Sequence, residues 1–306
     1  MSSNQITNYF RPVRIRGPRA GAHRPRRSRR EKLRSVAEET NELLPGILST
    51  VPSAPPTGQL CHGFRYGPLD PGFSPKLSAR VEVLFGDTFD IANGLGASAY
   101  PYNENNAETV CILNMANAKR PGGGWLNGAL AQEEALCYRS SLSSTLKRSF
   151  YPMKFLGAIY SPTVVIFRES LDRGHKLMDL QRPDLLPVVS VISVAAIQNP
   201  ELDQECSPPM YKNPRDREGT KNKMRTILRI AAYKKHRRIV LGALGCGAFG
   251  NPNVEVAACW AEVLREEEFQ GWWERIVFAI LDDATTLTQG LGNFDVFREK
   301  LHDMAI

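Results

Sequence analysis

The sequence predicts an α/β fold, in which helices cover the faces of a β-sheet, and two observations lead to this fold class. Short apolar runs typical of strands alternate with longer helical patterns between residues 81 and 281. Strands that alternate with helices pack as one sheet with helices on its faces. Hydrophobic residues make up 42% of the 306 residues, so the chain can bury a full core.

The expected elements follow one another from residue 31 onward. An amphipathic helix is expected over residues 31–47 and a connection rich in Pro and Gly over residues 51–80. Strands are expected at 81–85, 109–113, 163–167, 187–195, 238–243 and 275–281, and helices at 131–147, 218–235 and 253–268. Because the pattern shows neither an internal repeat nor a second core, we expect one folded domain over residues 31–306.

The basic charge of the chain lies in its first tenth. The net charge of +7 comes from 39 basic and 32 acidic residues, yet residues 1–30 contain nine arginines and no Asp, Glu or Lys. The remainder therefore carries 30 basic against 32 acidic residues. Since residues 1–30 are also poor in apolar side chains, we expect a disordered arm there. Its arginine cluster at 24–30 is typical of a nuclear import signal, a polyanion-binding arm or a solvated linker.

Three apolar residues near the start of the arm form a second pattern. Ile6, Tyr9 and Phe10 stand at i, i+3 and i+4, with basic residues after them. This resembles the box that binds sliding clamps, although that box has Gln where this chain has Ser3. The alternative is a tail that holds three apolar residues by chance.

The cysteine pattern and the hydropathy exclude several protein classes. No two of the six cysteines form a CxxC pair, and none joins a histidine at metal-ligand spacing. We therefore expect free thiols in a reducing compartment and no bound metal. No apolar stretch reaches the length of a membrane span, and the N-terminus lacks a hydrophobic signal core, so we expect neither a membrane protein nor a secreted one.

A triple glycine precedes a helix whose first turn carries two adjacent carboxylates. The residues are Gly122, Gly123, Gly124, Gln132, Glu133 and Glu134. Glycine permits positive φ and close approach of the backbone to a ligand. Paired carboxylates suit hydrolysis of a glycosidic bond, in which an acid protonates the leaving oxygen. The alternative is a flexible loop and two acids favoured by the helix dipole, and since that dipole lowers a carboxyl pKa, burial or substrate must raise it.

A second glycine-rich segment, residues 241–251, lies between an expected strand and an expected helix. A loop in this position presents free amides to a diphosphate. Gly245, Gly247 and Gly250 satisfy the spacing GxGxxG, but no acidic residue ends a following strand as a dinucleotide fold requires. The segment therefore indicates phosphate binding without naming a cofactor. Asp87, after the first expected strand, can accept a hydrogen bond from an adenine amino group or can cap a helix.

Together these motifs resemble the microbial-type poly(ADP-ribose) glycohydrolases. The family signature, GGG followed by six to eight residues and QEE, occurs at residues 122–134 with a spacing of seven. Segments 114–125 and 242–249 also match the family, in the family's order, and the resemblance runs from about residue 30 to residue 281. It implies a macrodomain-like three-layer α/β/α fold with a mixed central sheet, a cleft for ADP-ribose and no cofactor.

The resemblance also implies a role for each site residue. Glu134 would protonate the glycosidic oxygen between two ADP-ribose units, pass through an oxocarbenium-like state and deprotonate the attacking water, while Glu133 would hydrogen-bond ribose hydroxyls. The other implied substrate contacts are Asn117 near the same ribose, the loop of Gly122, Gly123 and Gly124 with Gln132 orienting it, Gly245, Cys246, Gly247 and Ala248 around the diphosphate, Phe249 against the distal ribose, and Asp87 at adenine.

Three alternatives remain open at this point. A non-catalytic ADP-ribose reader has no need of a second carboxylate, and a mono-ADP-ribosyl hydrolase would differ only in kinetics. A Rossmann oxidoreductase leaves the GGG–QEE segment unexplained. With the arm and the clamp-like box, the resemblance predicts a monomer in the nucleus, or also in the cytoplasm, that reverses protein ADP-ribosylation in the DNA damage response. Its expected partners are poly(ADP-ribose) and ADP-ribosylated proteins.

Overall fold

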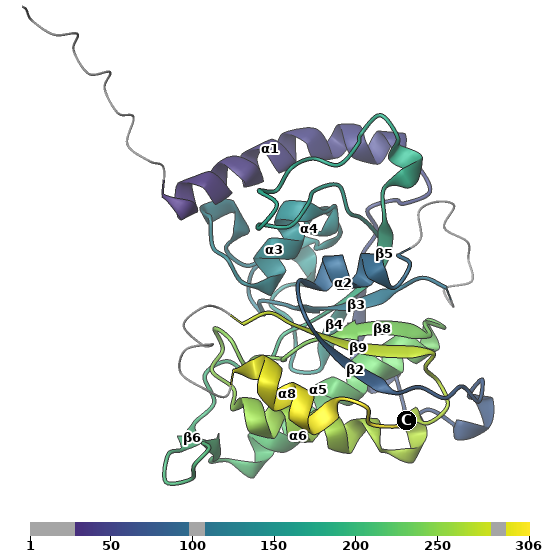
Figure 1. Cartoon of the computed structure of the whole chain (residues 1–306), viewed down its shortest axis with the longest axis vertical. Coiled ribbons are helices and arrows are strands. Elements are labelled where there is room, and N and C mark those ends of the chain that lie inside the picture. The colour runs from purple at the N-terminus through teal and green to yellow at the C-terminus, as the bar shows by residue number, and fades with distance from the viewer. Residues whose placement is uncertain (1–27, 98–107, 283–291) are drawn as a thin grey trace, which may run out of the picture.

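The computed structural model of the chain describes residues 28–97, 108–282 and 292–306 (Figure 1). The predicted clamp-binding box at Ile6, Tyr9 and Phe10 lies outside the described residues, as does the predicted arm up to residue 27. Within the described part, no helix combines the length and the apolar character that a membrane span requires.

A seven-stranded sheet forms the middle of the molecule, in the order β1-β4-β5-β3-β8-β9-β2. Its strands are β1 (Gln59–His62), β2 (Val81–Phe85), β3 (Cys111–Met115), β4 (Gly157–Val165), β5 (Val188–Val194), β8 (Arg238–Leu241) and β9 (Arg275–Ile280). β4 is antiparallel to β1 and to β5, whereas the other neighbours are parallel. The predicted mixed sheet is therefore confirmed. A small second sheet pairs β6 (Leu202–Asp203) with β7 (Met210–Tyr211).

Helices cover both faces of this sheet and complete the predicted three-layer α/β/α fold (Figure 1). One layer contains α1 (Arg29–Thr50), α2 (Thr88–Gly94), α3 (Gln132–Arg139) and α4 (Leu142–Thr145). The opposite layer contains α5 (Pro214–Tyr233), α6 (Asn253–Leu264) and α8 (Asn293–Leu301). In the described part of the chain, six short 3₁₀ helices lie at Gly63–Arg65, Pro71–Phe73, Trp125–Asn127 (η3), Arg148–Phe150 (η4), Pro183–Leu185 and Glu267–Phe269 (η6).

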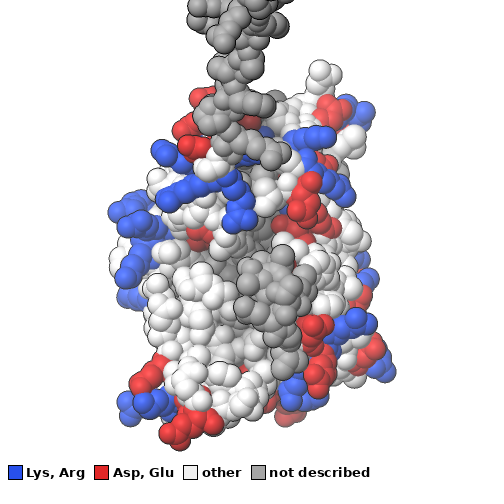
Figure 2. Space-filling model, turned by 60° about the vertical axis from the view of Figure 1, so that its left-hand side comes forward, with Lys and Arg blue, Asp and Glu red and all other residues white. Residues whose placement is uncertain are grey.

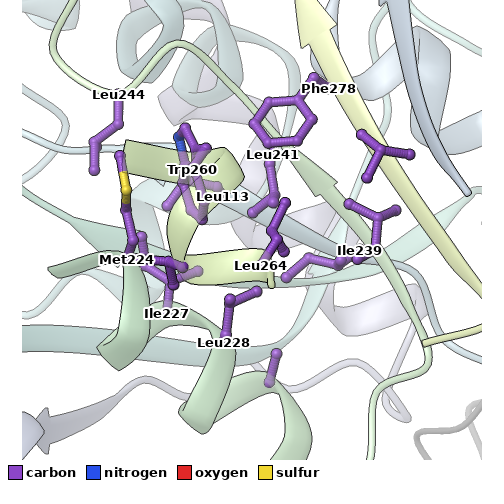
Figure 3. Close-up of a cluster of buried hydrophobic side chains, with 14 of the residues drawn as sticks. Leu113, Met224, Ile227, Leu228, Ile239, Leu241, Leu244, Trp260, Leu264 and Phe278 are labelled. Atoms are coloured by element: carbon purple, nitrogen blue, oxygen red, sulfur yellow. The ribbon is translucent and has the colours of Figure 1, made fainter. Parts of the chain in front are cut away.

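The two cores on either side of the sheet follow from the alternation of side chains along each strand. In β8, Ile239 and Leu241 face α5 and α6, whereas Val240 between them faces the layer of α2 and α3. Figure 3 shows the first of these cores, where Trp260 of α6 meets Phe278 of β9 with ring centroids 5.5 Å apart. Because consecutive residues serve opposite layers, one strand anchors both.

Several elements differ from the expected ones, each for a local reason. The connection over residues 51–80 contains β1, a four-residue edge strand too short to show a period. The helix expected at 131–147 breaks at Ser140, whose hydroxyl accepts from Leu142 N while Ser141 Oγ accepts from Val165 N at the end of β4. β4 begins at Gly157 rather than at 163, and its pairing with β5 shifts register around Pro162.

The first helix begins within the segment assigned to the arm. Ser28 caps α1 in a capping box with Glu31, so the helix starts at Arg29. Later in the chain, α6 ends at Leu264, and η6 follows where the sequence predicted a helix up to residue 268.

Candidate active site

The triple glycine forms a turn that only glycine fits. Gly122 and Gly123 have φ of 66° and 59°, in the left-handed region. A Cβ on Gly122 would lie 2.7 Å from Trp125 Cδ1, and a Cβ on Gly123 would overlap Glu134 Oε1. The absence of a side chain at Gly123 therefore brings the loop backbone against the carboxylate.

Tyr138 of α3 fastens the loop that follows the glycines. Its hydroxyl lies 2.7 Å from Ala129 O and 2.8 Å from Trp125 O, the carbonyls to which it can donate. Trp125 is buried and packs edge-on against the same tyrosine ring. From the other side, Arg30 of α1 donates its Nε to Asn127 O at 2.9 Å. The loop is thus fixed to two helices.

Glu134 is held by backbone amides at the start of α3. Its Oε1 accepts from Gly124 N at 2.8 Å, and its Oε2 accepts from Ala131 N at 3.0 Å. The second bond is the carboxylate half of a capping box, since Glu134 is the third residue of the helix. Glu134 is 9% exposed, so it is largely buried under the loop.

Glu133 lies deeper, against the end of β3. Its Oε2 accepts from Asn117 N at 2.8 Å, and its Oε1 lies 3.4 Å from Asn114 Nδ2. Burial raises the pKa of Glu133 to about 8, and the nearby Glu134 adds to this, although the bond from Asn117 opposes it. Asn114, which is also 3.0 Å from Ser193 Oγ, was missed by the sequence argument because a buried Asn in a strand carries no signal of its own.

Gln132 and Asn117 use their side chains within the protein. Gln132 Oε1 accepts from Met115 N, and its Nε2 donates to Leu113 O at 2.7 Å, so its amide ties α3 to β3. Gln132 was expected to orient the glycine loop, but these two bonds go to β3. Asn117 Oδ1 accepts from Lys119 N and Arg120 N and stabilises the turn before the glycines.

The second glycine-rich segment forms a turn after β8. Gly245 has φ of 79°, and a Cβ there would lie 2.5 Å from Asn251 Nδ2. A Cβ on Gly247 would meet nothing within 4 Å, so this position offers open backbone. Burial raises the pKa of the Cys246 thiol, which therefore lacks the thiolate character of a nucleophile.

A cleft extends from the region of Asp87 to the second glycine-rich segment, and the triple glycine at residues 122–124 does not line it. A cavity of about 640 Å³ is lined by Asp87, Thr88 and Arg139, and a smaller one of about 110 Å³ is lined by Gly245, Gly247, Ala248 and Phe249. Met115, Ala131 and Gln132 line both cavities. Cys246, Asn117 and the two carboxylates do not line either one, and Glu133 and Glu134 lie one and two positions beyond Gln132 in α3.

Asp87 caps a helix and forms an ion pair at the wide end of the cleft. Its Oδ1 accepts from Phe89 N at 2.8 Å, the capping role that the sequence left open as the alternative to an adenine contact. Arg139 NH1 also donates to Asp87, while NH2 reaches Asp90 at 2.5 Å. Arg139 is 1% exposed, and its role could not be predicted from the sequence because basic residues are common in the last turn of a helix.

The described residues contain no cluster of His, Cys, Asp or Glu that could hold a metal ion. The site contains a buried carboxylate pair, one member with a raised pKa and the other held by backbone amides, and such groups can act in general acid–base catalysis.

Comparison with known proteins shows which family this chain resembles. Residues 65–169 match the family model described as microbial-type PARG, catalytic domain. Over this segment the chain is similar to the microbial-type poly(ADP-ribose) glycohydrolases. No curated protein matches the chain.

Solved structures of poly(ADP-ribose) glycohydrolases share this fold. The enzyme from Thermomonospora curvata is 26% identical with a TM-score of 0.69, over 89% of this chain and 100% of that one. The same enzyme bound to the inhibitor ADP-HPD matches with a TM-score of 0.66 and 26% identity, over 88% and 99%. The enzyme from Deinococcus radiodurans in complex with ADP-ribose is 28% identical with a TM-score of 0.61, over 80% and 93%. The predicted family and the predicted enzyme class are thus confirmed.

Proposed function

We propose that this chain hydrolyses the ribose–ribose O-glycosidic bonds of poly(ADP-ribose) and releases ADP-ribose. The observation that carries the proposal is Glu134, which lies under the triple-glycine loop and next to a cleft with a second glycine-rich turn at its narrow end. The family match and the solved glycohydrolases bound to ADP-ribose or to an inhibitor support the same activity.

The cleft suggests how one ADP-ribose unit binds. Adenine would occupy the wide end beside Asp87, and the diphosphate would lie along the backbone at Gly245 and Gly247. Phe249 would pack against the distal ribose, whose anomeric carbon then faces α3. Glu133 and Asn117 would contact the hydroxyls of that ribose after a shift of the loop that covers them.

In the proposed reaction, Glu134 donates a proton to the oxygen that joins two units. The bond from this oxygen to C1 of the distal ribose breaks, the oxygen leaves as a hydroxyl, and the ribose becomes oxocarbenium-like. A water molecule then adds to C1 and gives a proton to Glu134, which restores the acid. Glu133, with a pKa near 8, is largely protonated at pH 7, so the pair carries about one negative charge fewer than two free carboxylates would.

The first test is a release assay on automodified poly(ADP-ribose), with products separated by size. We expect free ADP-ribose from the wild type and a loss of ~10²- to 10⁴-fold in Glu134→Gln, which keeps its shape but cannot donate the proton. Glu267→Gln is the matched control, because Glu267 is exposed in η6 at the end of the opposite layer. Tight ADP-ribose binding without any product from the wild type would show a reader instead, and release from mono-ADP-ribosylated protein alone would show a mono-ADP-ribosyl hydrolase.

We further propose that the enzyme acts in the nucleus, on polymer made at damaged DNA. The support is the arginine-rich composition of residues 1–30 together with the clamp-like spacing of Ile6, Tyr9 and Phe10. Deleting residues 1–27 should abolish capture by an immobilised sliding clamp and nuclear accumulation of a fluorescent fusion, while activity on free polymer stays. Capture that survives replacement of Ile6, Tyr9 and Phe10 by Ala would rule out the clamp box.

A further inference from the structure

A third cavity, of about 440 Å³, lies along the triple-glycine loop, between this loop, α1 and α4. Its polar lining consists of Asn41, Arg120, Asn127, Ser143, Ser144 and Arg148, and none of the described acidic residues lines it. We refer to this cavity as the basic groove. Its volume lies in the range of sites for small molecules, and the adenine end and the second glycine-rich turn both belong to the other cavities.

The groove offers positive charge that no carboxylate of the described residues neutralises. Arg120 and Arg148 are exposed, and within residues 28–97, 108–282 and 292–306 neither guanidinium takes part in an ion pair or a hydrogen bond. Lys119 and Lys147, their neighbours in sequence, are exposed as well. Figure 2, in which the side with the start of α1 comes forward, shows several Lys and Arg side chains gathered on this side of the molecule. Such a surface favours a ligand with phosphate groups.

The groove borders the carboxylates through a single layer of backbone. Gly123 lines the groove, and a Cβ on this residue would overlap Glu134 Oε1 and lie 3.1 Å from Glu133 Oε2. The next amide, Gly124 N, donates to Glu134. A polymeric ligand that passes over Gly123 would therefore reach from the carboxylate of Glu134 into the basic groove.

The chemistry of the polymer places charge on the leaving side of the scissile bond. When one ADP-ribose unit fills the cleft, the leaving oxygen of the scissile bond belongs to the adenosine ribose of the next unit. That same ribose carries a diphosphate, so two negative charges lie a few bonds from Glu134 on the leaving side. In the proposed binding mode the cleft would hold one diphosphate at Gly245 and Gly247, and cations elsewhere on the protein would favour binding of the second.

We propose that the basic groove binds the leaving-side ADP-ribose unit of the polymer, with Arg120 and Arg148 at its diphosphate. This inference rests on the proposed glycohydrolase function. It also gives the site a basis for specificity, because an ADP-ribose attached directly to an amino-acid side chain has no diphosphate on its leaving side. The groove therefore favours bonds between ADP-ribose units over the bond that joins the first unit to protein.

Two substrates that differ only on the leaving side test the proposal. One is a two-unit ADP-ribose with a single scissile bond, and the other is ADP-ribose that carries 4-nitrophenol at C1 of its distal ribose, here called the aryl substrate. We expect Arg120→Ala and Arg148→Ala each to lower the ratio of kcat/KM for the two-unit substrate to that for the aryl substrate by about tenfold. Raising the salt concentration should lower this ratio in the wild type and lower it less in the variants.

The control is Arg265→Ala, which removes an exposed arginine from the end of α6, on the opposite face of the sheet. Its ratio should equal that of the wild type. Binding gives a second readout in the Glu134→Gln background. There Arg120→Ala and Arg148→Ala should raise the dissociation constant of the two-unit ligand and leave the dissociation constant of free ADP-ribose unchanged. Circular dichroism melts would show that the variants fold.

The outcomes distinguish a failure of the proposed function from a failure of the groove inference. A wild type that cleaves neither substrate overturns the proposed function, and the groove inference falls with it. A wild type that cleaves the two-unit substrate, combined with ratios and dissociation constants that Arg120→Ala and Arg148→Ala leave unchanged, overturns the groove inference alone. Equal weakening of the two-unit ligand and of ADP-ribose would place the arginines at the cleft rather than on the leaving side.

Discussion

The raised pKa of Glu133 makes the stability of the protein depend on pH in a definite direction. Burial moves this pKa from 4.5 to about 8. Between these two values the folded protein holds a proton that the unfolded chain releases, so the free energy of unfolding falls as the pH rises. Each pH unit contributes ~1.4 kcal/mol, and the full window therefore amounts to about 5 kcal/mol. Below pH 4.5 both states are protonated and the effect vanishes.

Glu133→Gln removes this dependence, because the amide does not titrate. We expect the stability difference between the wild type and Glu133→Gln, measured by urea unfolding from pH 4.5 to 9, to shift by about 3–5 kcal/mol against the wild type as the pH rises. Glu267→Gln serves as the control, since Glu267 is exposed. Parallel pH profiles for the wild type and Glu133→Gln would refute the reasoning that burial keeps Glu133 protonated.

Two further predictions concern the loop and the ion pair. Gly123→Ala places a methyl group against Glu134 at a φ of 59°, so turnover of poly(ADP-ribose) should fall by at least about a hundredfold. The control is Gly46→Ala, where a Cβ meets nothing within 4 Å, and it should keep the turnover of the wild type. Equal turnover in the two variants would contradict the close approach of Gly123 to Glu134. Arg139→Met leaves Asp87 and Asp90 without their cation, so the free energy of unfolding, measured by urea unfolding, should fall by about 3–5 kcal/mol. A change below about 1 kcal/mol would show that the ion pairs of Arg139 contribute little to stability.

The sequence predicted the parts of the site that depend on backbone chemistry. Gly122 and Gly123 need positive φ and have no room for a side chain, so the presence of glycine at these positions indicates a tight turn. The alternation of strands and helices likewise reports the layers, because buried parallel strands leave long apolar runs. β1 escaped prediction, since four residues between prolines and glycines show no period.

The contacts that come from distant parts of the chain could not be predicted. Arg139 and Asp87 are 52 positions apart, and the sequence around either residue does not indicate that the two form an ion pair. The side chain of Asn114 meets Glu133 only after β3 and α3 have packed. Arg120 and Arg148 gather in one groove for the same reason, although each alone resembles an ordinary solvated arginine.

The most direct test of the central claim, that Glu134 protonates the leaving oxygen, compares two leaving groups. The hydroxyl of ribose needs a proton to leave, whereas 4-nitrophenol leaves as its anion. The account predicts that Glu134→Gln lowers kcat/KM on two-unit ADP-ribose by ~10²- to 10⁴-fold and on the aryl substrate by at least about tenfold less. An equal loss on both substrates would contradict it, because Glu134 would then act only in steps that both substrates share, such as binding or deprotonation of the water.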